Sequence, residues 1–520
     1  MPKCNFPLCL GIFISKDRIM KKLVLLVFVL SALLVQAQRK PNPKPFAKHI
    51  TIEDLQRHLY IIAGAEMEGR ETATEGQRKA AAYIQNEFKT LGLAPGNKND
   101  YQMYFPVYVD SLQNLFLSVN DTAFVAGEDF SVNLMANHPA GYHFSEVVFA
   151  GYGISDSTRD DYKNLDVKGK LVMVWSEDVP AGRRKGFSGF TQQSAAMENG
   201  AAALLVINKN ITPTNSKGSM YVNRYQKTQG INTFYISEKL AEKIIGSGYG
   251  AQKAAAQTAG YTPQVYASNI ALSFNKTTIT LQSSNVLGIL EGTDLKDEYV
   301  VLTAHYDHLG TKNGTIWYGA DDDGSGTVTI LELAKAFSKA KAAGKGPRRS
   351  ILFMTVSGEE KGLWGSDYYS SHPALPLDKT TVNLNIDMIG RIDPSRNHGD
   401  SSNYIYIVGD DKLSSDLKPI SEAINKKYSK LELDYKYNDP RDPERIYYRS
   451  DHYNFAKNGV PVIFYFSGLH PDYHKPTDTP DKINYSLMQK RAKLIFFTAW
   501  DMANRDDMLK RDIPLDGRTR

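Results

Sequence analysis

The sequence predicts an α/β protein, in which a mixed, mostly parallel central sheet is flanked by helices and carries a smaller α/β insertion. Beyond Ser283, near-continuous apolar runs alternate with amphipathic segments, as expected for strands that are buried on both faces and joined by helices. In addition, 520 residues are too many for one ordinary domain, and residues 145–270 show a separate α/β pattern. We therefore expect two folded units.

The first part of the chain is predicted to be helical. Thr51 followed by Asp54 resembles a helix N-terminal cap, and Gly76–Leu91 carries apolar residues at helical spacing. Two helices are therefore expected within Thr51–Leu93. From Phe105 to Phe149 the pattern changes to short β-like runs that are broken by Asn, Asp and Gly.

Residues 145–270 follow as a separate unit. We predict a strand, an acidic turn, a second strand, a helix and a third strand. The regular elements are expected at Val147–Ala150, Lys170–Trp175, Thr191–Asn199 and Ala203–Ile207. The chain contains no internal repeat and no long low-complexity tract, so this change of pattern is its main subdivision.

The part beyond Ser283 carries the main sheet. Its strands are predicted at Tyr299–Ala304, Ser350–Val356, Val382–Ile386, Tyr404–Val408 and Val460–Phe466. Its helices are predicted near Thr327–Ala342, Ser414–Lys427 and Leu487–Met502. Ligands gather at the carboxyl ends of strands in open α/β sheets, so polar residues just past these strands can converge on one site.

The charge of the chain is nearly balanced once its first residues are set aside. The formal net charge is +5, but residues 1–37 hold five basic residues and one acidic residue. The rest of the chain has 57 basic and 56 acidic residues. No strong field remains to attract nucleic acid or an anionic membrane, so neither is an expected partner.

The N-terminus has the features of a secretory signal peptide, which we assign to residues 1–37. The basic segment Met20-Lys21-Lys22 precedes the apolar run Leu23–Val35, and Ala37 completes a small-residue cleavage site. We predict export to the periplasm or the extracellular medium, with Met20 as a better start than Met1. The apolar run is short for a membrane span, so no stable anchor is expected.

Cysteine chemistry is not expected in the exported chain. Both cysteines, Cys4 and Cys9, lie in the predicted leader. The mature chain then has neither a disulfide nor a thiolate metal site. Any zinc ion must therefore be held by His and carboxylate side chains.

Five short motifs, each just past a predicted strand or in a loop, carry candidate catalytic residues. The first contains His305 and Asp307, and Asp307 can orient the imidazole of His305 toward a metal. The second is Asp321-Asp322-Asp323, in which three successive carboxylates repel one another unless a cation lies among them. Each motif by itself is also compatible with a solvated polar turn.

The other three motifs come later in the chain. Glu359 and Glu360 follow an apolar strand and can divide their roles, one binding metal and the other accepting a proton. Asp387 lies within an apolar run, where a buried carboxylate needs a cation or several donors. Tyr473 and His474 lie in a Pro-containing loop, which taken alone is typical of ordinary surface.

Taken together and in this order, the five motifs resemble the co-catalytic zinc exopeptidases of peptidase family M28, which include aminopeptidase Y and glutamate carboxypeptidase II. The resemblance includes Met67-Glu-Gly-Arg70-Glu71 and Ser450-Asp451-His452. Within residues 145–270, Gly151-Tyr-Gly153, Asp161-Tyr162 and Val167–Val172 look like a protease-associated (PA) domain. The resemblance implies a zinc exopeptidase fold with a PA insertion that has no chemistry of its own.

The resemblance also implies a metal site with two Zn²⁺ ions. Asp322 matches the carboxylate that bridges them, because it lies three residues before Ser325 of a Ser-Gly pair. Glu359 matches the general base that acts on a metal-bridging water. The remaining ligands would be His305 and Asp387 on one ion, and Glu360 and His474 on the other.

Further features follow from the same resemblance. Tyr473 matches a tyrosine that hydrogen-bonds to the tetrahedral intermediate in some members, and the Asp322–Asp323 peptide is expected to be cis. Three other histidines rank below His474 because none precedes the Lys-Pro-x-Asp type of segment that follows it. They are His308, His452 and His470.

The implied function is an exported zinc-dependent aminopeptidase that hydrolyses N-terminal residues of peptides. The alternatives are a carboxypeptidase of the same family, a single-zinc glutaminyl cyclase and a non-catalytic receptor-like scaffold. Asp322 and the Glu359-Glu360 pair favour two metals, and the complete ligand set argues against a scaffold. A carboxypeptidase needs clustered Arg at its cleft, whereas Arg183-Arg184-Lys185 is flanked by Gly and suits an exposed loop better.

These observations predict the following domain organisation. The signal peptide, residues 1–37, is followed by a linker at 38–48. The peptidase domain comprises residues 49–110 and 276–510, and the PA insertion comprises residues 111–275 with its core at about 145–270. Residues 511–520 form a tail.

Overall fold

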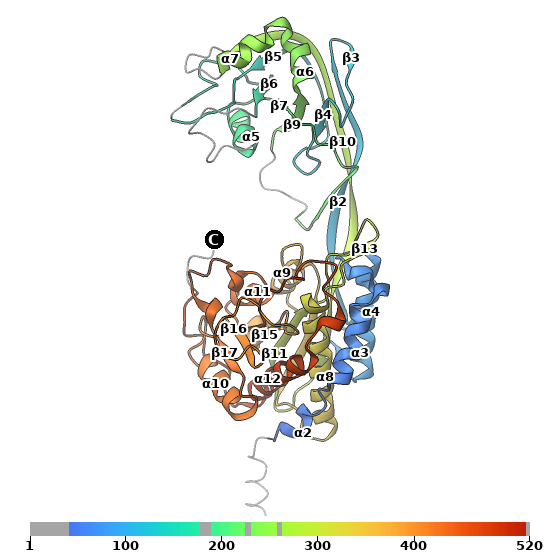
Figure 1. Cartoon of the computed structure of the whole chain (residues 1–520), viewed down its shortest axis with the longest axis vertical. Helices are drawn as coiled ribbons and strands as arrows, with labels where there is room; N and C mark the ends of the chain where they lie inside the picture. The colour runs from blue at the N-terminus through green and yellow to red at the C-terminus, as the bar shows by residue number, and fades with distance from the viewer. Residues whose placement is uncertain (1–40, 158, 177–188, 224–229, 257–262, 516–520) are drawn as a thin grey trace, which may run out of the picture. The chain divides into compact units, whose positions relative to one another are not determined.

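The computed structural model describes residues 41–157, 159–176, 189–223, 230–256 and 263–515, which form two compact units (Figure 1). The first unit contains the described residues up to Glu71, Glu75–Met103 and everything from Asn285 onward. The second contains Thr72–Thr74 and Tyr104–Ser284. The division falls at 103/104 and 284/285, whereas the sequence predicted 110/111 and 275/276. The reason is that two long strands cross the division without a turn that would mark it.

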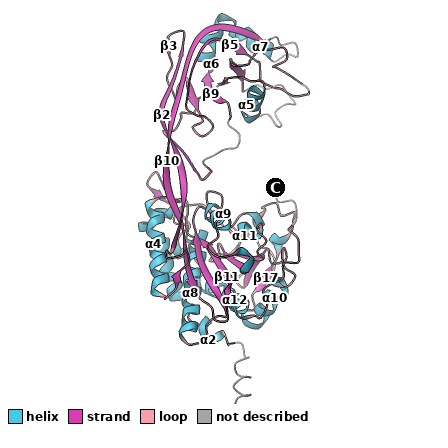
Figure 2. Cartoon of the chain, turned by 180° about the vertical axis from the view of Figure 1, so that it is seen from behind, coloured by secondary structure: helices cyan, strands magenta, loops and turns pink. Residues whose placement is uncertain are grey.

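The first unit is built on a mixed sheet (Figure 2). In spatial order its strands are β17 (Glu432–Asp434), β16 (Tyr404–Val408), β18 (Val462–Phe466), β15 (Thr380–Ile386), β11 (Leu295–His305), β14 (Arg349–Val356) and the end of β10 (Gln264–Leu290). The neighbours from β18 to β14 are all parallel, as are β16 and β17, whereas β16–β18 and β14–β10 are antiparallel. The predicted mixed, mostly parallel sheet is confirmed.

Helices cover this sheet. The first long one, α3 (Ile52–Ile62), begins as predicted at Thr51, whose hydroxyl accepts a hydrogen bond from the Asp54 backbone N–H at 3.2 Å. The other long helices of this unit are α4 (Glu75–Thr90), α8 (Gly326–Ala342), α10 (Leu417–Tyr428) and α12 (Tyr485–Asn504). Phe337 of α8 and Trp500 of α12 stack in the core with their ring centroids 5.7 Å apart.

Shorter elements complete the first unit. They are α2 (Lys44–Ala47), α9 (Trp364–Ser371), α11 (His452–Ala456), β1 (Ala94–Pro95), β12 (Thr311–Lys312) and β13 (Thr315–Ile316). Single helical turns lie at Ala65–Arg70, Ala320–Ser325, Leu377–Lys379, Lys436–Asn438, Ile446–Tyr448 and Pro480–Lys482. Two of these turns, Ala320–Ser325 and Ile446–Tyr448, contribute residues to the candidate site.

The second unit has its own sheet and core. From β10 the strand order continues through β5 (Ala140–Phe149), β6 (Leu171–Trp175), β7 (Ala203–Asn208), β9 (Asn232–Ser237) and β4 (Phe130–Val132). The neighbours from β5 to β9 are parallel. Its other elements are β2 (Gln102–Val119), β3 (Thr122–Ala123), β8 (Lys217–Tyr221), α5 (Gly189–Glu198), α6 (Glu238–Ile245) and α7 (Tyr249–Ala256).

The strand β2 differs from the sequence prediction. Several short runs were expected after Phe105 because polar residues interrupt the apolar pattern, yet one strand spans Gln102–Val119. The buried Asp110 shows why, since its carboxylate pairs with Lys276 at 2.7 Å and accepts a hydrogen bond from Tyr221 at 2.9 Å. A polar side chain that is satisfied within the sheet does not break the strand.

Some predicted features lie outside the described residues. These are the signal peptide with Cys4 and Cys9, the Arg183-Arg184-Lys185 segment and the last residues of the tail, 516–520. Within the described ranges, no helix has the length and apolar character needed to span a bilayer.

Candidate metal centre and active site

The predicted site residues follow the carboxyl ends of neighbouring parallel strands. His305 is the last residue of β11, Glu359 comes shortly after β14, and Asp387 directly follows β15. His474 lies in the loop after β18, and Asp322 lies in the turn that leads into α8. Because these strands are adjacent and parallel, their following residues meet at one edge of the sheet. The peptide between Asp322 and Asp323 is cis, as expected.

Asp322 lies at the centre of the cluster. Its Oδ1 is 3.2 Å from Nε2 of His305, and its Oδ2 is 3.1 Å from Nε2 of His474. His305 Nε2 is also 3.7 Å from Oδ1 of Asp387, and His474 Nε2 is 3.0 Å from Oε2 of Glu360. The structure thus brings the five predicted ligands together in two groups that share the Asp322 carboxylate.

The separations within each group suit a common ion. Zn–N and Zn–O bonds of about 2.0–2.2 Å place two ligands of one tetrahedral zinc about 3.3 Å apart. Several buried polar atoms of the cluster also have no hydrogen-bond partner within the described chain, as expected for atoms that face a cation. They are His305 Nε2, Asp322 Oδ2 and Glu360 Oε1. The residues therefore fit divalent metal.

Asp323 is close enough to be grouped with His305 and Asp387 as a metal site. However, its Oδ2 accepts the backbone N–H of His305 at 3.1 Å, and its Oδ1 accepts those of Gly326 and Met388 at 2.8 and 3.1 Å. A carboxylate engaged by three amides is better explained as the support of the loop. We therefore retain Asp322 as the ligand candidate.

His308 is more involved than the sequence predicted. It is fully buried, and its Nδ1 lies 2.7 Å from Oε1 of Glu360 and 3.8 Å from Oδ2 of Asp322. The side chain of His474, by contrast, is 39% exposed. The two imidazoles approach Glu360 together, so the geometry alone permits either as a ligand. The spacing of His308, three residues after His305, was the signal in the sequence.

Two neighbouring residues support the candidate ligands. Asp307 lies beside His305, with its backbone carbonyl 3.1 Å and its carboxylate 3.7 Å from Nδ1 of the imidazole. The closer group is thus the carbonyl, whereas the sequence suggested the carboxylate. Ser450 donates a hydrogen bond to Oδ2 of Asp387 at 2.7 Å. Such contacts orient ligand side chains toward a metal.

Glu359 has the position expected of a proton acceptor. Its carboxylate lines the small pocket at the cluster, 3.9 Å from Nε2 of His305, and its side chain is 13% exposed. Burial raises the pKa of Glu359 well above its usual range; His305 opposes this rise, whereas Asp387 and Glu360 add to it. A raised pKa suits a carboxylate that must take up and release a proton near neutral pH.

The His–carboxylate contacts dominate the electrostatics of the cluster. Burial alone would lower the pKa of His474, but the adjacent carboxylates of Asp322 and Glu360 raise it to about 10. Burial would raise the pKa of Asp322, but the adjacent imidazoles of His305 and His474 hold it well below its usual range. The protonated imidazoles therefore supply positive charge among these carboxylates, and metal binding would displace their protons.

The pocket beside the cluster is small and has both polar and apolar walls. Its volume is about 30 Å³, enough for water but not for a large side chain. Tyr473 lines it, and the Tyr473 hydroxyl accepts a hydrogen bond from Nη2 of Arg449 at 3.3 Å. Both Arg449 and Leu469 are at least partly exposed, so they can move to admit a substrate. The other apolar lining residues are Met388, Ile446, Phe464 and Phe466.

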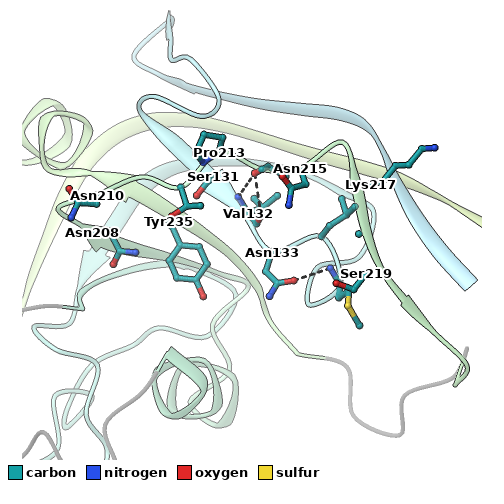
Figure 3. A pocket seen from close by; sticks show the side chains of 15 residues that line it. Ser131, Val132, Asn133, Asn208, Asn210, Pro213, Asn215, Lys217, Ser219 and Tyr235 are labelled. Atoms are coloured by element: carbon teal, nitrogen blue, oxygen red, sulfur yellow. Dashed lines mark hydrogen bonds between the residues drawn. The ribbon is translucent and has the colours of Figure 1, made fainter. Parts of the chain in front are cut away.

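The second unit holds a pocket of a different kind (Figure 3). It has a volume of about 560 Å³, and amide side chains such as Asn133 and Asn210 line it together with Tyr235. No His, Cys, Asp or Glu occurs among its described lining residues. This pocket offers no His, Cys, Asp or Glu ligands for a metal ion among its described lining residues.

Known proteins match this chain in sequence and in fold. Residues 285–499 match the model of Peptidase family M28. A probable leucine aminopeptidase of Trichophyton verrucosum is 28% identical over 293 residues, covering 55% of this chain and 70% of the relative. A probable leucine aminopeptidase 2 of Aspergillus oryzae is 25% identical over 496 residues, covering 89% of this chain and 86% of the relative.

The fold agrees with that of a solved enzyme. The structure of an aminopeptidase from Aneurinibacillus sp. strain AM-1 superposes with a TM-score of 0.51 at 19% identity. The match covers 91% of this chain and 99% of the other. The family model matches the part of the chain that carries the candidate ligand cluster, and the match to the Aspergillus oryzae relative covers most of the chain. Residues 285–499 thus match peptidase family M28, the metallo-exopeptidases that the motifs of this chain resemble.

Proposed function

We propose that this chain is an exported aminopeptidase that holds two Zn²⁺ ions and removes N-terminal residues from peptides. The observation that carries the proposal is the Asp322 carboxylate, whose two oxygens face two separate groups of His and carboxylate side chains. His305 and Asp387 would hold one ion, and Glu360 and His474 the other. When bound, zinc supplies Lewis acidity to the scissile carbonyl and lowers the pKa of the attacking water.

The residues of the chain would then carry out the proton transfers. Glu359 takes the proton from the attacking water and returns it to the nitrogen of the leaving amine. Tyr473, whose hydroxyl is already oriented by Arg449, donates a hydrogen bond to the oxygen that becomes negative in the transition state. The apolar pocket residues, such as Met388 and Phe466, exclude water and receive the side chain of the N-terminal residue.

The direction of cleavage follows from the charges at the pocket. A free α-amino group is cationic and is favoured by the carboxylates of Glu359 and Asp387. A C-terminal carboxylate would need several cations, and Arg449 is the only cationic side chain among the described residues that line the pocket. Arg449 also contacts Tyr473, so it is not a free anion site.

One experiment tests this direction. A short peptide with a free amine and an amidated C-terminus is compared with its N-acetylated, free-acid twin. We expect hydrolysis of the first and not of the second. Cleavage of the second alone would establish a carboxypeptidase and leave the metal site in place.

Zinc content tests the metal site independently of direction. We expect two zinc ions per chain in the purified mature protein, measured by elemental analysis. One ion would favour a cyclase-like site, and none would favour a scaffold. The interpretation of residues 111–275 as a PA insertion and of residues 1–37 as a signal peptide stays a prediction. N-terminal sequencing of the exported protein tests the latter.

A further inference from the structure

The first unit contains a second cavity, separate from the catalytic pocket, with a volume of about 780 Å³. This volume lies within the range of small-molecule sites. Four tyrosines and two arginines are among its lining residues: Tyr437, Tyr447, Tyr448, Tyr453, Arg441 and Arg445. We propose that this cavity binds a ligand with an aromatic ring and a carboxylate, either a free aromatic acid or the C-terminal aromatic residue of a peptide.

Three of the tyrosines form one packed aromatic wall. The ring centroids of Tyr447 and Tyr448 are 5.2 Å apart, those of Tyr448 and Tyr453 are 5.1 Å apart, and those of Tyr447 and Tyr453 are 5.9 Å apart. All three pairs are arranged edge to face, the favourable geometry for aromatic pairs. A wall of mutually packed rings provides a rigid surface on which a ligand ring can stack at little entropic cost.

The carboxylates that line the cavity are already engaged. Asp439 pairs with Arg441, its Oδ1 lying 3.3 Å from Nε of the guanidinium. Asp411 pairs with Lys412 at 3.2 Å. The carboxylate of Asp442 accepts backbone N–H groups that follow it at 2.9 and 3.0 Å. None of these carboxylates is therefore a partner for the remaining cation of the cavity.

That cation is Arg445, which is exposed and forms no ion pair within the described residues. Its guanidinium lies over the ring of Tyr448, 5.0 Å from the centroid. The backbone at Arg445 is held in a left-handed conformation, with φ at 53°, and its N–H bonds to the carbonyl of Asp442 at 3.2 Å. A guanidinium held in this way can bind a carboxylate through two hydrogen bonds while a ligand ring stacks beside it.

This cavity and the catalytic pocket are lined by different residues of one short segment, residues 445–449. Ile446 and Arg449 line the catalytic pocket, whereas Arg445, Tyr447 and Tyr448 line the second cavity. A ligand bound in the second cavity therefore does not occupy the substrate position. Its binding is expected to be independent of an inhibitor that fills the catalytic pocket.

The test uses the whole zinc-loaded protein and N-acetyl-phenylalanine, whose blocked amine prevents its use as an aminopeptidase substrate. Isothermal titration should show saturable binding with a Kd of about 1 mM or tighter. Two probes each lack one of the recognised groups: N-acetyl-phenylalanine amide has no carboxylate, and N-acetylglycine has no ring. We expect both to bind at least about tenfold more weakly. Leucine hydroxamate is a chelator that we expect to bind at the proposed zinc site, and a saturating amount of it should leave the Kd unchanged.

Two variants and a matched control locate the site. Arg445→Gln should weaken the binding of N-acetyl-phenylalanine about tenfold and leave the binding of its amide unchanged. Tyr448→Leu should weaken the binding of both. Arg441→Gln removes a guanidinium of the same cavity that is already paired, so its effect should stay within about twofold. An N-acetylated tripeptide ending in phenylalanine distinguishes the two ligand sources. Equal binding of the tripeptide indicates peptide C-termini, and binding of the small acid alone indicates a free aromatic acid.

Several results would overturn the proposal. Absence of saturable binding, equal affinity for acid and amide, or displacement by leucine hydroxamate would each do so. An Arg445→Gln variant that binds as tightly as the unmodified protein would have the same consequence. Hydrolysis of free-amine peptides is measured in parallel, so that failure of this site is distinguished from failure of the proposed aminopeptidase function.

Discussion

The buried guanidinium of Arg70 donates a hydrogen bond from Nη2 to the backbone carbonyl of Asp322 at 3.3 Å, directly beside the cis peptide. The same nitrogen donates to the carbonyl of Gly319 at 2.6 Å, and Nη1 donates to the carbonyl of Tyr318. Arg70 has no exposed surface. One side chain from the start of the chain thus holds three carbonyls of the loop that carries the central candidate ligand.

Arg70→Met is expected to weaken both the fold and the metal site. It leaves buried carbonyls without donors, so the free energy of unfolding should fall by about 3–5 kcal/mol. Displacement of the loop should weaken zinc binding by about 10–100-fold, measured by competition with a chromogenic chelator. Arg78→Met provides a control, because Arg78 forms only an exposed ion pair with Glu75 and should change stability by less than about 1 kcal/mol. Zinc affinity that is unchanged in Arg70→Met would show that Arg70 does not position Asp322.

Glu359 and Glu360 are expected to respond differently to the same substitution. Glu359→Gln keeps the shape of the side chain but cannot accept a proton, so kcat should fall by about 10²–10⁴-fold with both zinc ions retained. Glu360→Gln should lose zinc, because Glu360 contacts His308 and His474. Elemental analysis of the two purified variants separates the roles. If Glu359→Gln lost zinc and Glu360→Gln retained both ions, the assignment of base and ligand would be reversed.

Asp410 gives the stability of the first unit a dependence on pH. Burial raises its pKa to about 7, although the amide of Asn438 donates a hydrogen bond to it at 2.9 Å. Between pH 4 and pH 7 the unfolded chain loses this proton while the folded chain keeps it, so folding stability decreases as pH rises through this range. Asp410→Asn removes this effect. The free energy of unfolding of the variant should exceed that of the unmodified protein by near zero at pH 4 and by about 2–4 kcal/mol above pH 7.

Thermal unfolding of Asp410→Asn and of the unmodified protein at pH 4.5, 6 and 8 tests this expectation. The two proteins are compared with each other at each pH, so general effects of pH on stability cancel. Asp378→Asn, at an exposed carboxylate, serves as the control and should change stability by less than about 0.5 kcal/mol at every pH. An Asp410→Asn difference that is independent of pH would contradict the assignment.

Leu469 is expected to contribute to side-chain preference. Its side chain lies among the apolar residues of the catalytic pocket, and truncation removes surface against which a leucyl or phenylalanyl side chain would pack. Leu469→Ala should lower kcat/KM for leucyl substrates about tenfold and for alanyl substrates less. Equal losses for both substrates would indicate a general disturbance of the site rather than loss of a specificity contact.

The sequence alone determined the elements that carry the site. The apolar runs of β11, β14 and β15 predicted their own positions because strands buried on both faces are mostly apolar. Polar residues that follow such strands then mark the sheet edge where ligands gather, which predicted the convergence of His305, Asp322, Glu360 and Asp387. The cis peptide after Asp322 was also predicted, in this case from family resemblance rather than from residue pattern.

Only the tertiary structure decided how these groups are supported and which neighbours compete with them. The Lys-Pro-x-Asp type of segment after His474 ranked His308 below it, yet both imidazoles approach Glu360, because a turn after β11 and a loop after β18 meet there. The link from Arg70 to Asp322 joins residues far apart in the chain. No local pattern encodes such contacts, since a buried side chain is satisfied by whichever backbone groups the packing brings to it.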